Sequence, residues 1–209
     1  MGFSGIWLVV ALSDAEIARI SPDFRARVEA AEAEPETLRR WDRWVSAPEE
    51  VRGVRPVPGV PNRLDFNEAS LDFLMMFTHP LEESDLMRTW HAIAEPEPIM
   101  FLMTRKCFAV TALFHGIGPR RAKMLPGFQG NFLLRPDRVR AALPAVEAAL
   151  TFDDAGRKVA EERISDWLTT AGDSHDNPTE IVDGFMRIFS EAARRDLGLC
   201  GVTVHDSCL

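Results

Sequence analysis

The sequence has little of what usually marks a catalytic or metal-binding protein. It contains three cysteines, an odd number that is too small for a disulfide scaffold and that fits a reducing compartment, so we expect a cytoplasmic location. No GxSxG elbow, Walker loop, dinucleotide-binding glycine motif or HExxH pair occurs. We therefore expect no cofactor, and no motif places a nucleophile beside a base and an oxyanion-binding group.

Long apolar runs are also lacking. The N-terminal run covers residues 6–12, follows no basic region and meets Ser13 before any small-residue cleavage pattern. It is too short for a signal peptide or a membrane span, so we expect no membrane association. Its valines and leucines favour a strand that is buried on both faces.

Lysine is scarce, so arginine carries nearly all of the positive charge. The formal net charge of -8 disfavours broad electrostatic binding to nucleic acid or anionic lipid. One segment differs, because residues 98–136 contain no acidic residue and carry +6, which leaves -14 on the rest of the chain. We expect the arginines of this segment to be satisfied within the protein or at a subunit contact.

The order of predicted elements indicates an α+β fold, mostly helical, with residues 1–209 as one domain. Strands are expected at residues 6–12 and 200–204, which are apolar and β-branched. Neither strand satisfies its backbone groups alone, so we expect both in one small sheet. Residues 46–63 hold four prolines and two glycines, which excludes a regular helix and predicts a surface loop.

Capping residues mark the expected helix ends. Ser13 begins a capping box, Asn67 is the N-cap of a helix over residues 68–78, and Asn177 opens the last helix. Gly198 is expected to end that last helix as its C-terminal cap.

The spacing of apolar residues assigns buried faces to these helices. In a helix that begins near residue 35, Leu38, Trp41 and Val45 fall on one face. The helix over residues 68–78 is apolar almost all round, which indicates central burial. Another helix is expected at residues 84–94.

The second half of the chain follows the same logic. Pro144 marks a kink or break in a helix that leads to residue 150. The next helix is expected to bury Phe152, Val159, Ile164, Trp167 and Leu168. Residues 99–115 are compatible with either strand or helix.

This frame resembles the bacterial YfbM-like family, domain of unknown function 1877. The resemblance begins with Met1-Gly2-x-x-Gly5, continues through residues 68–78 and 132–139, and ends in the last helix and closing strand. The family tends to open its buried helix with Asp-Lys-x-Trp and to end it with Leu-Thr-Gly, of which this chain retains only Thr78. The resemblance implies a compact α+β fold in a bacterial protein, and it supplies no activity.

Three tryptophans and two histidines are candidates for contact with a ligand or partner. They are Trp41, Trp44, Trp90, His91 and His115. Core packing is the competing interpretation of the tryptophans. The sequence therefore predicts a non-enzymatic domain that acts through protein or small-ligand contacts, and it leaves homo-oligomerisation open. The alternative is an enzyme whose histidine and acid, a general-base pair, are brought together from distant positions.

A second alternative is nucleic-acid binding through a helix-hairpin-helix-like turn at residues 116–125. Gly116 and Gly118 would present backbone amides to a phosphate, and Arg120, Arg121 and Lys123 would strengthen the contact. Such motifs usually occur in pairs, and this chain has one. The competing interpretation is a glycine turn whose arginines pair with acidic residues of the same protein.

A third candidate is a metal site near the C-terminus. Cys200, His205 and Cys208 are residue types that bind zinc, yet their spacing lacks the CxxC pair of structural zinc sites. The competing interpretation is a small apolar cysteine in a strand that is followed by a polar tail.

Overall fold

The computed structural model describes residues 4–20, 24–52, 55–56, 64–65, 67–77, 81–92, 98–105, 107–171 and 177–206. The helices are α1 (Asp14–Ile17), α2 (Phe24–Glu32), α3 (Pro35–Ser46), α4 (Glu68–Met76), α5 (Glu83–Ala92), α6 (Ala109–Ala122), α7 (Pro136–Leu150), α8 (Asp154–Ala171), α9 (Pro178–Arg194) and the short 3-10 helix η1 (Pro48–Glu50). The strands are β1 (Ser4–Leu12), β2 (Arg55–Pro56), β3 (Leu64–Asp65), β4 (Ile99–Arg105), β5 (Phe132–Leu134) and β6 (Gly198–Asp206).

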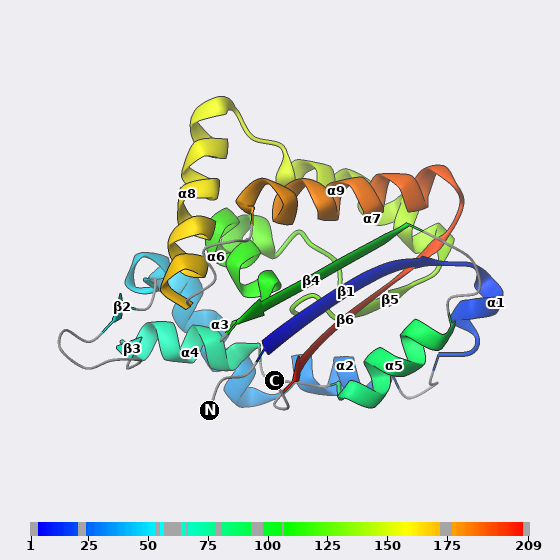
Figure 1. Cartoon of the computed structure of the whole chain (residues 1–209), viewed down its shortest axis with the longest axis horizontal. Coiled ribbons are helices and arrows are strands. Elements are labelled where there is room, and N and C mark those ends of the chain that lie inside the picture. The colour runs from blue at the N-terminus through cyan, green and yellow to red at the C-terminus, as the bar shows by residue number, and fades with distance from the viewer. Residues whose placement is uncertain are drawn as a thin grey trace.

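The main sheet has four antiparallel strands in the order β4-β1-β6-β5. β1 and β6 pair along their whole length, from Ser4 opposite Asp206 to Leu12 opposite Gly198. The ends of the chain therefore supply the two central strands (Figure 1). This confirms the predicted α+β fold, in which both terminal strands belong to one small sheet.

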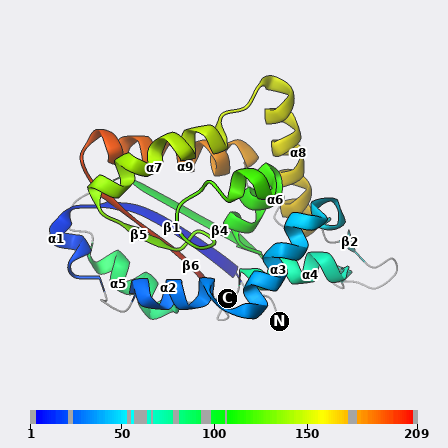
Figure 2. The same cartoon turned by 180° about the vertical axis from the view of Figure 1, so that it is seen from behind.

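Helices cover both faces of the sheet, and β1 alternates between the two cores. α7 and α9 lie on one side, while α2 and α5 lie on the other (Figure 1, and from behind in Figure 2). Trp7 and Val9 belong to the larger core with α6, α7 and α9, whereas Leu8 and Val10 belong to the smaller core with α2 and α5. The run at residues 6–12 is therefore buried on both faces, as its composition predicts.

Three of the expected N-caps are confirmed. Ser13 and Glu16 form a complete capping box, with the Ser13 backbone N–H donating to the Glu16 carboxylate at 2.6 Å. The Asn67 side chain accepts from the Ser70 amide at 2.7 Å, and the Asn177 side chain accepts from the Thr179 amide at 3.0 Å. These bonds satisfy amides that the first helical turns leave without partners.

The predicted C-terminal cap at Gly198 is wrong. α9 ends at Arg194, and Asp196 takes the left-handed conformation with φ 55°. Gly198 instead begins β6, where an added Cβ would lie 2.5 Å from the Leu134 carbonyl oxygen. Close strand packing, and not helix termination, explains the glycine. Pro144 likewise interrupts no helix, because α7 continues through it to Leu150.

Several assignments of buried faces were also wrong. Leu38 and Val45 are 48% and 46% exposed, and α3 instead buries Thr37 and Trp44. Val159 is 47% exposed on α8. α4 is buried on one side only, since its exposed residues include Leu71 and Met75.

Residues 99–115, which are compatible with either strand or helix in the sequence, contain both, namely the edge strand β4 and the start of α6. In the predicted surface loop at residues 46–63, the described residues include η1 and the strand β2, which pairs with β3, and Val51 is buried. Residues 53–54 and 57–63 lie outside the described residues, so for them the loop stays a prediction. In the part of the chain that the structure describes, no helix has the length and apolar character needed to span a bilayer.

Candidate functional site

Two cavities flank the contact between α3 and α6. Trp41 and Trp44 project from α3, with ring centroids 5.1 Å apart in an edge-to-face arrangement. Trp44 also stacks on Phe114 of α6 at 6.4 Å. One cavity is lined by Trp41 and Phe114, and the other by Trp44 and His115.

Ion pairs fix α3 in this position. The helix begins at a proline, which suits the first turn because that position needs no amide donor. Arg43 donates to Asp72 of α4 at 2.8 Å and to Glu68 at 3.0 Å. Arg40 donates to the Met75 carbonyl oxygen at 3.2 Å. These contacts hold α3 against α4, while Trp44 packs on Phe114 of α6.

The Trp41 cavity has a volume of about 170 Å³. Its lining combines apolar side chains from α3 and α6 with polar residues at Glu32, Thr37, Lys123 and Gln129. Thr37 and Gln129 are buried, whereas Glu32 and Lys123 are exposed and of opposite charge. The cavity is therefore mostly apolar inside and carries no strong charge of one sign.

Gln129 is the most unusual residue of this cavity. It is 4% exposed, and neither Nε2 nor Oε1 has a hydrogen-bond partner among the residues that the structure describes. Its backbone is in the left-handed region, with φ 53°, where residues other than glycine are uncommon. A buried amide without partners costs about 1–3 kcal/mol, so native proteins rarely keep one.

The surrounding loop holds Gln129 in this strained conformation. Phe128 and Asn131 exchange two backbone hydrogen bonds, of 2.9 and 2.8 Å, across the turn. The Asn131 side chain accepts from the Thr203 amide at 2.7 Å, and Trp7 Nε1 donates to the Gly130 carbonyl oxygen at 3.2 Å. The sheet thus anchors the two residues that follow Gln129, and the turn bonds link them back to Phe128.

Glycine is required on both sides of this residue. Gly127 and Gly130 have φ 77° and 85°. An added Cβ would lie 2.4 Å from the Asn131 carbonyl oxygen at Gly127, and 2.8 Å from Val110 Cγ2 at Gly130. Strain that persists because its surroundings enforce it is characteristic of binding sites.

We expect Gln129→Met to raise the free energy of unfolding by about 1 kcal/mol, because methionine keeps the length of the side chain and removes the unpaired amide. Urea denaturation followed by circular dichroism measures the change. Gln129→Glu is the opposite control, since it buries a charge at the same place and lowers stability. A Gln129→Met protein less stable than wild type would show that the amide has a partner within the fold.

The second cavity, of about 410 Å³, surrounds His115. It also gathers Trp44, Arg163, Asp166 and Glu49. Burial, and after it the positive charge of Arg163, lowers the pKa of His115 to about 4, so the imidazole is neutral at neutral pH. Its ring packs between Trp167, at 5.0 Å, and Phe73, at 6.2 Å.

The His115 cavity brings a histidine and acids together from distant positions, as the enzyme hypothesis requires. However, no carboxylate among the described residues is hydrogen-bonded to the His115 ring. A general base is usually oriented by such a partner, and a pKa near 4 makes this imidazole a weak base. The geometry shows a packed aromatic residue at the edge of a polar cavity.

The glycine turn at residues 116–125 has structural reasons for its sequence. An added Cβ at Gly116 would lie 2.4 Å from Ile164 Cγ1, so this glycine allows α6 to pack closely on α8. Gly118 has φ 75° and interrupts the helix, and only one further turn follows, from Pro119 to Ala122. The second helix of a helix-hairpin-helix is therefore a single turn.

The basic residues of this turn differ in their contacts. Arg121 donates to the carbonyl oxygens of Ala149 and Thr151 at the end of α7, at 2.8 and 2.9 Å, and stacks on Phe152 at 4.1 Å. It thus caps a helix C-terminus, where a cation is favoured. Arg120 and Lys123 are exposed.

The structure does not bring the three candidate metal ligands together in the part of the chain that it describes. Cys200 is fully buried, and burial raises the pKa of its thiol to about 12, so it stays protonated. His205 lies in β6 opposite Gly5, and Cys208 is outside the described residues. In the described part of the chain, no three His, Cys, Asp or Glu residues are close enough to hold a metal ion.

The remaining candidates, Trp90 and His91, lie on α5, on the other side of the sheet from α7 and α9. Both are exposed. The structure therefore brings together Trp41, Trp44 and His115 from the predicted group and separates Trp90 and His91 from them.

Gln129 is the residue that the sequence analysis missed. The signal available was the segment 126–130, in which a proline and two glycines surround a glutamine within a few residues. That pattern predicts a turn, but burial of the glutamine depends on Trp7 and Thr203, which are distant in sequence.

Comparisons of the sequence with protein-family models and with curated proteins, and of the fold with solved structures, find no match.

Proposed function

We propose that this protein is a non-enzymatic domain that binds a small neutral ligand in the Trp41 cavity. The observation that supports this most directly is the buried, unpaired amide of Gln129 on a backbone held in the left-handed region. A ligand that hydrogen-bonds to this amide offsets the free-energy cost of burying the amide without a partner.

The cavity limits the chemistry of the ligand. Its volume of about 170 Å³ is close to that of a cavity of about 150 Å³ that holds one benzene ring. The Gln129 side chain offers a donor and an acceptor side by side, which match a carboxamide or a lactam edge. Trp41 and Phe114 provide apolar walls for a planar ring. The ligand class that fits this cavity is therefore a ring of about six atoms that carries an amide-like edge.

Benzamide is a suitable probe of this proposal. We expect it to bind wild-type protein with a dissociation constant in the millimolar range, as befits nine heavy atoms. Ligand-observed NMR measures the binding, and quenching of tryptophan fluorescence checks it. Gln129→Met should weaken binding about tenfold or more, because the hydrogen bonds of the amide are lost.

Two controls make this test specific. N,N-Dimethylbenzamide keeps the ring and the acceptor but has no N–H donor, so it should bind wild type more weakly than benzamide does and lose less affinity in Gln129→Met. Val159→Ala alters an exposed residue of α8 outside the cavity and should bind benzamide like wild type. Equal binding of benzamide to wild type and Gln129→Met, or no binding to either, would contradict the proposal.

The YfbM-like family relationship and the cytoplasmic location remain part of this proposal. The pairing of β1 with β6 supports the first, since it joins the two ends of the family-like frame. The buried thiol of Cys200, which forms no disulfide among the described residues, supports the second.

A further inference from the structure

The edge strand β4 presents an uncovered apolar face. β4 is the first strand of the order β4-β1-β6-β5, and among the described strands it pairs only with β1. It runs across the front of the molecule between α9 and α5 (Figure 1). α5 packs mainly against β6 and reaches β4 through the ring of Trp90, which meets Phe101.

The exposed residues of β4 continue a layer that is buried elsewhere. On β4, the exposed positions are Ile99, Phe101 and Met103, which are 44%, 47% and 49% exposed. Their register partners on β1 are Val10, Leu8 and Ile6, which are 0%, 0% and 9% exposed. Directly opposed residues share one face of a sheet. Among the described residues, the apolar layer under α5 thus runs past the edge of the helix and stays about half exposed.

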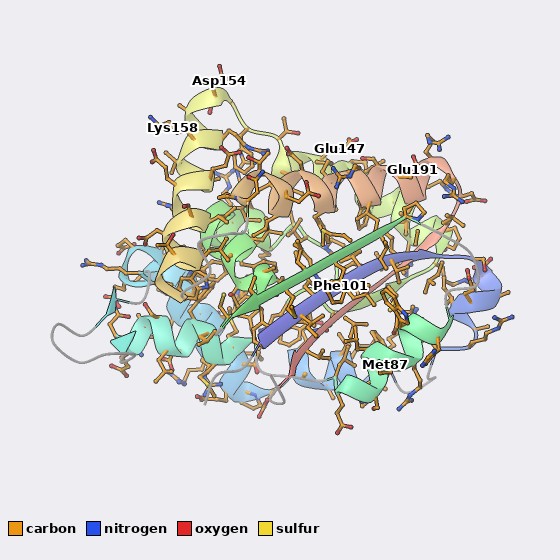
Figure 3. The ribbon with its side chains drawn as sticks, in the orientation of Figure 1. Met87, Phe101, Glu147, Asp154, Lys158 and Glu191 are labelled. Carbon is orange, nitrogen blue, oxygen red and sulfur yellow. The ribbon has the colours of Figure 1, made fainter. Side chains whose placement is uncertain are left out.

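α5 extends this apolar surface. Met87 and Trp90 are 44% and 47% exposed, and the Trp90 ring meets Phe101 edge to face at 6.3 Å. Figure 3 shows Met87 on α5 below the sheet and Phe101 at the front of it. We call these five residues, namely Met87, Trp90, Ile99, Phe101 and Met103, the β4 face.

The central part of β4 lacks the features that usually prevent edge-to-edge association, although Pro98 precedes the strand and its last residue is Arg105. Residues 99–104 contain no charge, proline or glycine. Native edge strands normally carry an inward charge, a proline or a bulge that blocks pairing with another chain. An unprotected apolar edge therefore requires a partner.

We propose that the β4 face is the interface of a homodimer in which β4 pairs antiparallel with β4 of a second copy. A two-fold axis at Phe101 places Ile99 of each copy opposite Met103 of the other and brings the two Phe101 rings together. This register overlaps all three apolar side chains and gives a continuous sheet through both copies. An antiparallel edge is self-complementary, so a second copy fits without any further specificity.

The β4 face alone supplies more than half of the area that a stable dimer buries on each partner. Five large side chains of ~200 Å² each, exposed to about half, amount to roughly 450–500 Å², near the upper limit for patches on monomers. A stable interface buries about 800 Å² on each partner. The groove beside β4 supplies additional area, since Pro98, Gly184 and Ile188 line it against α9.

The charges around the β4 face also allow two copies to meet. α9 carries the pairs Arg187–Glu180 and Arg194–Glu191 along this side, so both signs are present. These two pairs add no net charge to this side of the molecule. Surface pairs of mixed sign cost little when two identical surfaces approach.

Sedimentation of the full chain over a range of concentrations tests the dimer. We expect wild type to dimerise in the micromolar range or tighter. Phe101→Lys should weaken the dimer at least about 30-fold, because it places two lysines against each other in the centre of the interface. Val159→Lys is the matched control, since Val159 is also 47% exposed but lies on α8, and this variant should dimerise like wild type.

Circular dichroism checks that each variant is folded, and Met103→Lys provides a second disrupting variant if Phe101→Lys fails to fold. A wild-type protein that stays monomeric at the highest concentration would overturn the proposal, and any partner of this face would then be a different protein. A dimer that survives both lysine substitutions would overturn it as well. The outcome is independent of the Trp41 cavity, which lies on other elements of the fold.

Discussion

Replacing Trp7 with alanine is expected to lower the free energy of unfolding by about 3–5 kcal/mol, the usual cost of truncating a buried tryptophan. Trp7 is 1% exposed, stacks on Phe185 with centroids 5.2 Å apart, and donates to the Gly130 carbonyl oxygen at 3.2 Å. The substitution therefore opens a cavity in the larger core and leaves a buried carbonyl group without its donor. Urea denaturation followed by circular dichroism measures the loss as a lower midpoint at an unchanged slope.

Trp7→Phe separates the two contributions. Phenylalanine fills most of the volume but has no N–H, so its cost should be about 1–3 kcal/mol, mainly from the unpaired Gly130 carbonyl group. Because Gly130 adjoins Gln129, benzamide binding should weaken in Trp7→Phe even though the residue lies outside the cavity. A loss below 1 kcal/mol in Trp7→Ala would mean that the loop and the core repack freely around the missing ring.

The frame of the fold could be predicted because it depends on local sequence. The apolar runs at residues 6–12 and 200–204 need hydrogen-bond partners, and they are each other's partners in the register of β1 and β6. The caps at Ser13 and Asn67 act within four residues of chain, so their chemistry is visible in the sequence. Features of short range are the ones that periodicity and capping describe.

Burial of individual helix faces could not be predicted in the same way. The spacing of Leu38, Trp41 and Val45 identifies a stripe, but the neighbours of α3 cover the side that carries Thr37 and Trp44. That side is covered because Trp44 packs on Phe73 of α4 and Phe114 of α6, which are distant in sequence. A single helix does not contain that information.

The prediction for the basic segment, residues 98–136, is tested for only some of its residues. The expectation that its arginines are satisfied within the protein is confirmed for Arg121, which caps α7. Arg135 lies 3.8 Å from Asp14, a weaker surface pair. The side chains of Arg105 and Lys106 are outside the described residues, so for them it stays a prediction.

The glycine turn is explained by helix packing at Gly116, a contact with α8 that no local pattern encodes.

His115 is expected to make the protein less stable as the pH falls from about 6.5 to about 4. In the unfolded chain a histidine has a pKa near 6.5, whereas burial first and Arg163 second lower the pKa of His115 to about 4 in the fold. Between these values the unfolded state binds a proton that the folded state does not, so stability rises with pH across this window. The full effect corresponds to about 3 kcal/mol and is complete above pH 6.5.

His115→Phe isolates this effect, because phenylalanine keeps the ring contacts with Phe73 and Trp167 and has no titrating group. The difference in unfolding free energy between His115→Phe and wild type should grow in favour of the variant by about 3 kcal/mol from pH 7 to pH 4. Trp167→Phe alters the same cluster without removing a titrating group, so its difference from wild type should stay constant over that range. A difference that is also independent of pH would mean that the pKa of His115 is the same in the folded and unfolded states, which would contradict its burial as a neutral ring. A difference that instead grows in favour of wild type as the pH falls would mean that the fold raises the pKa, which would point to a carboxylate partner and revive the enzyme hypothesis for its cavity.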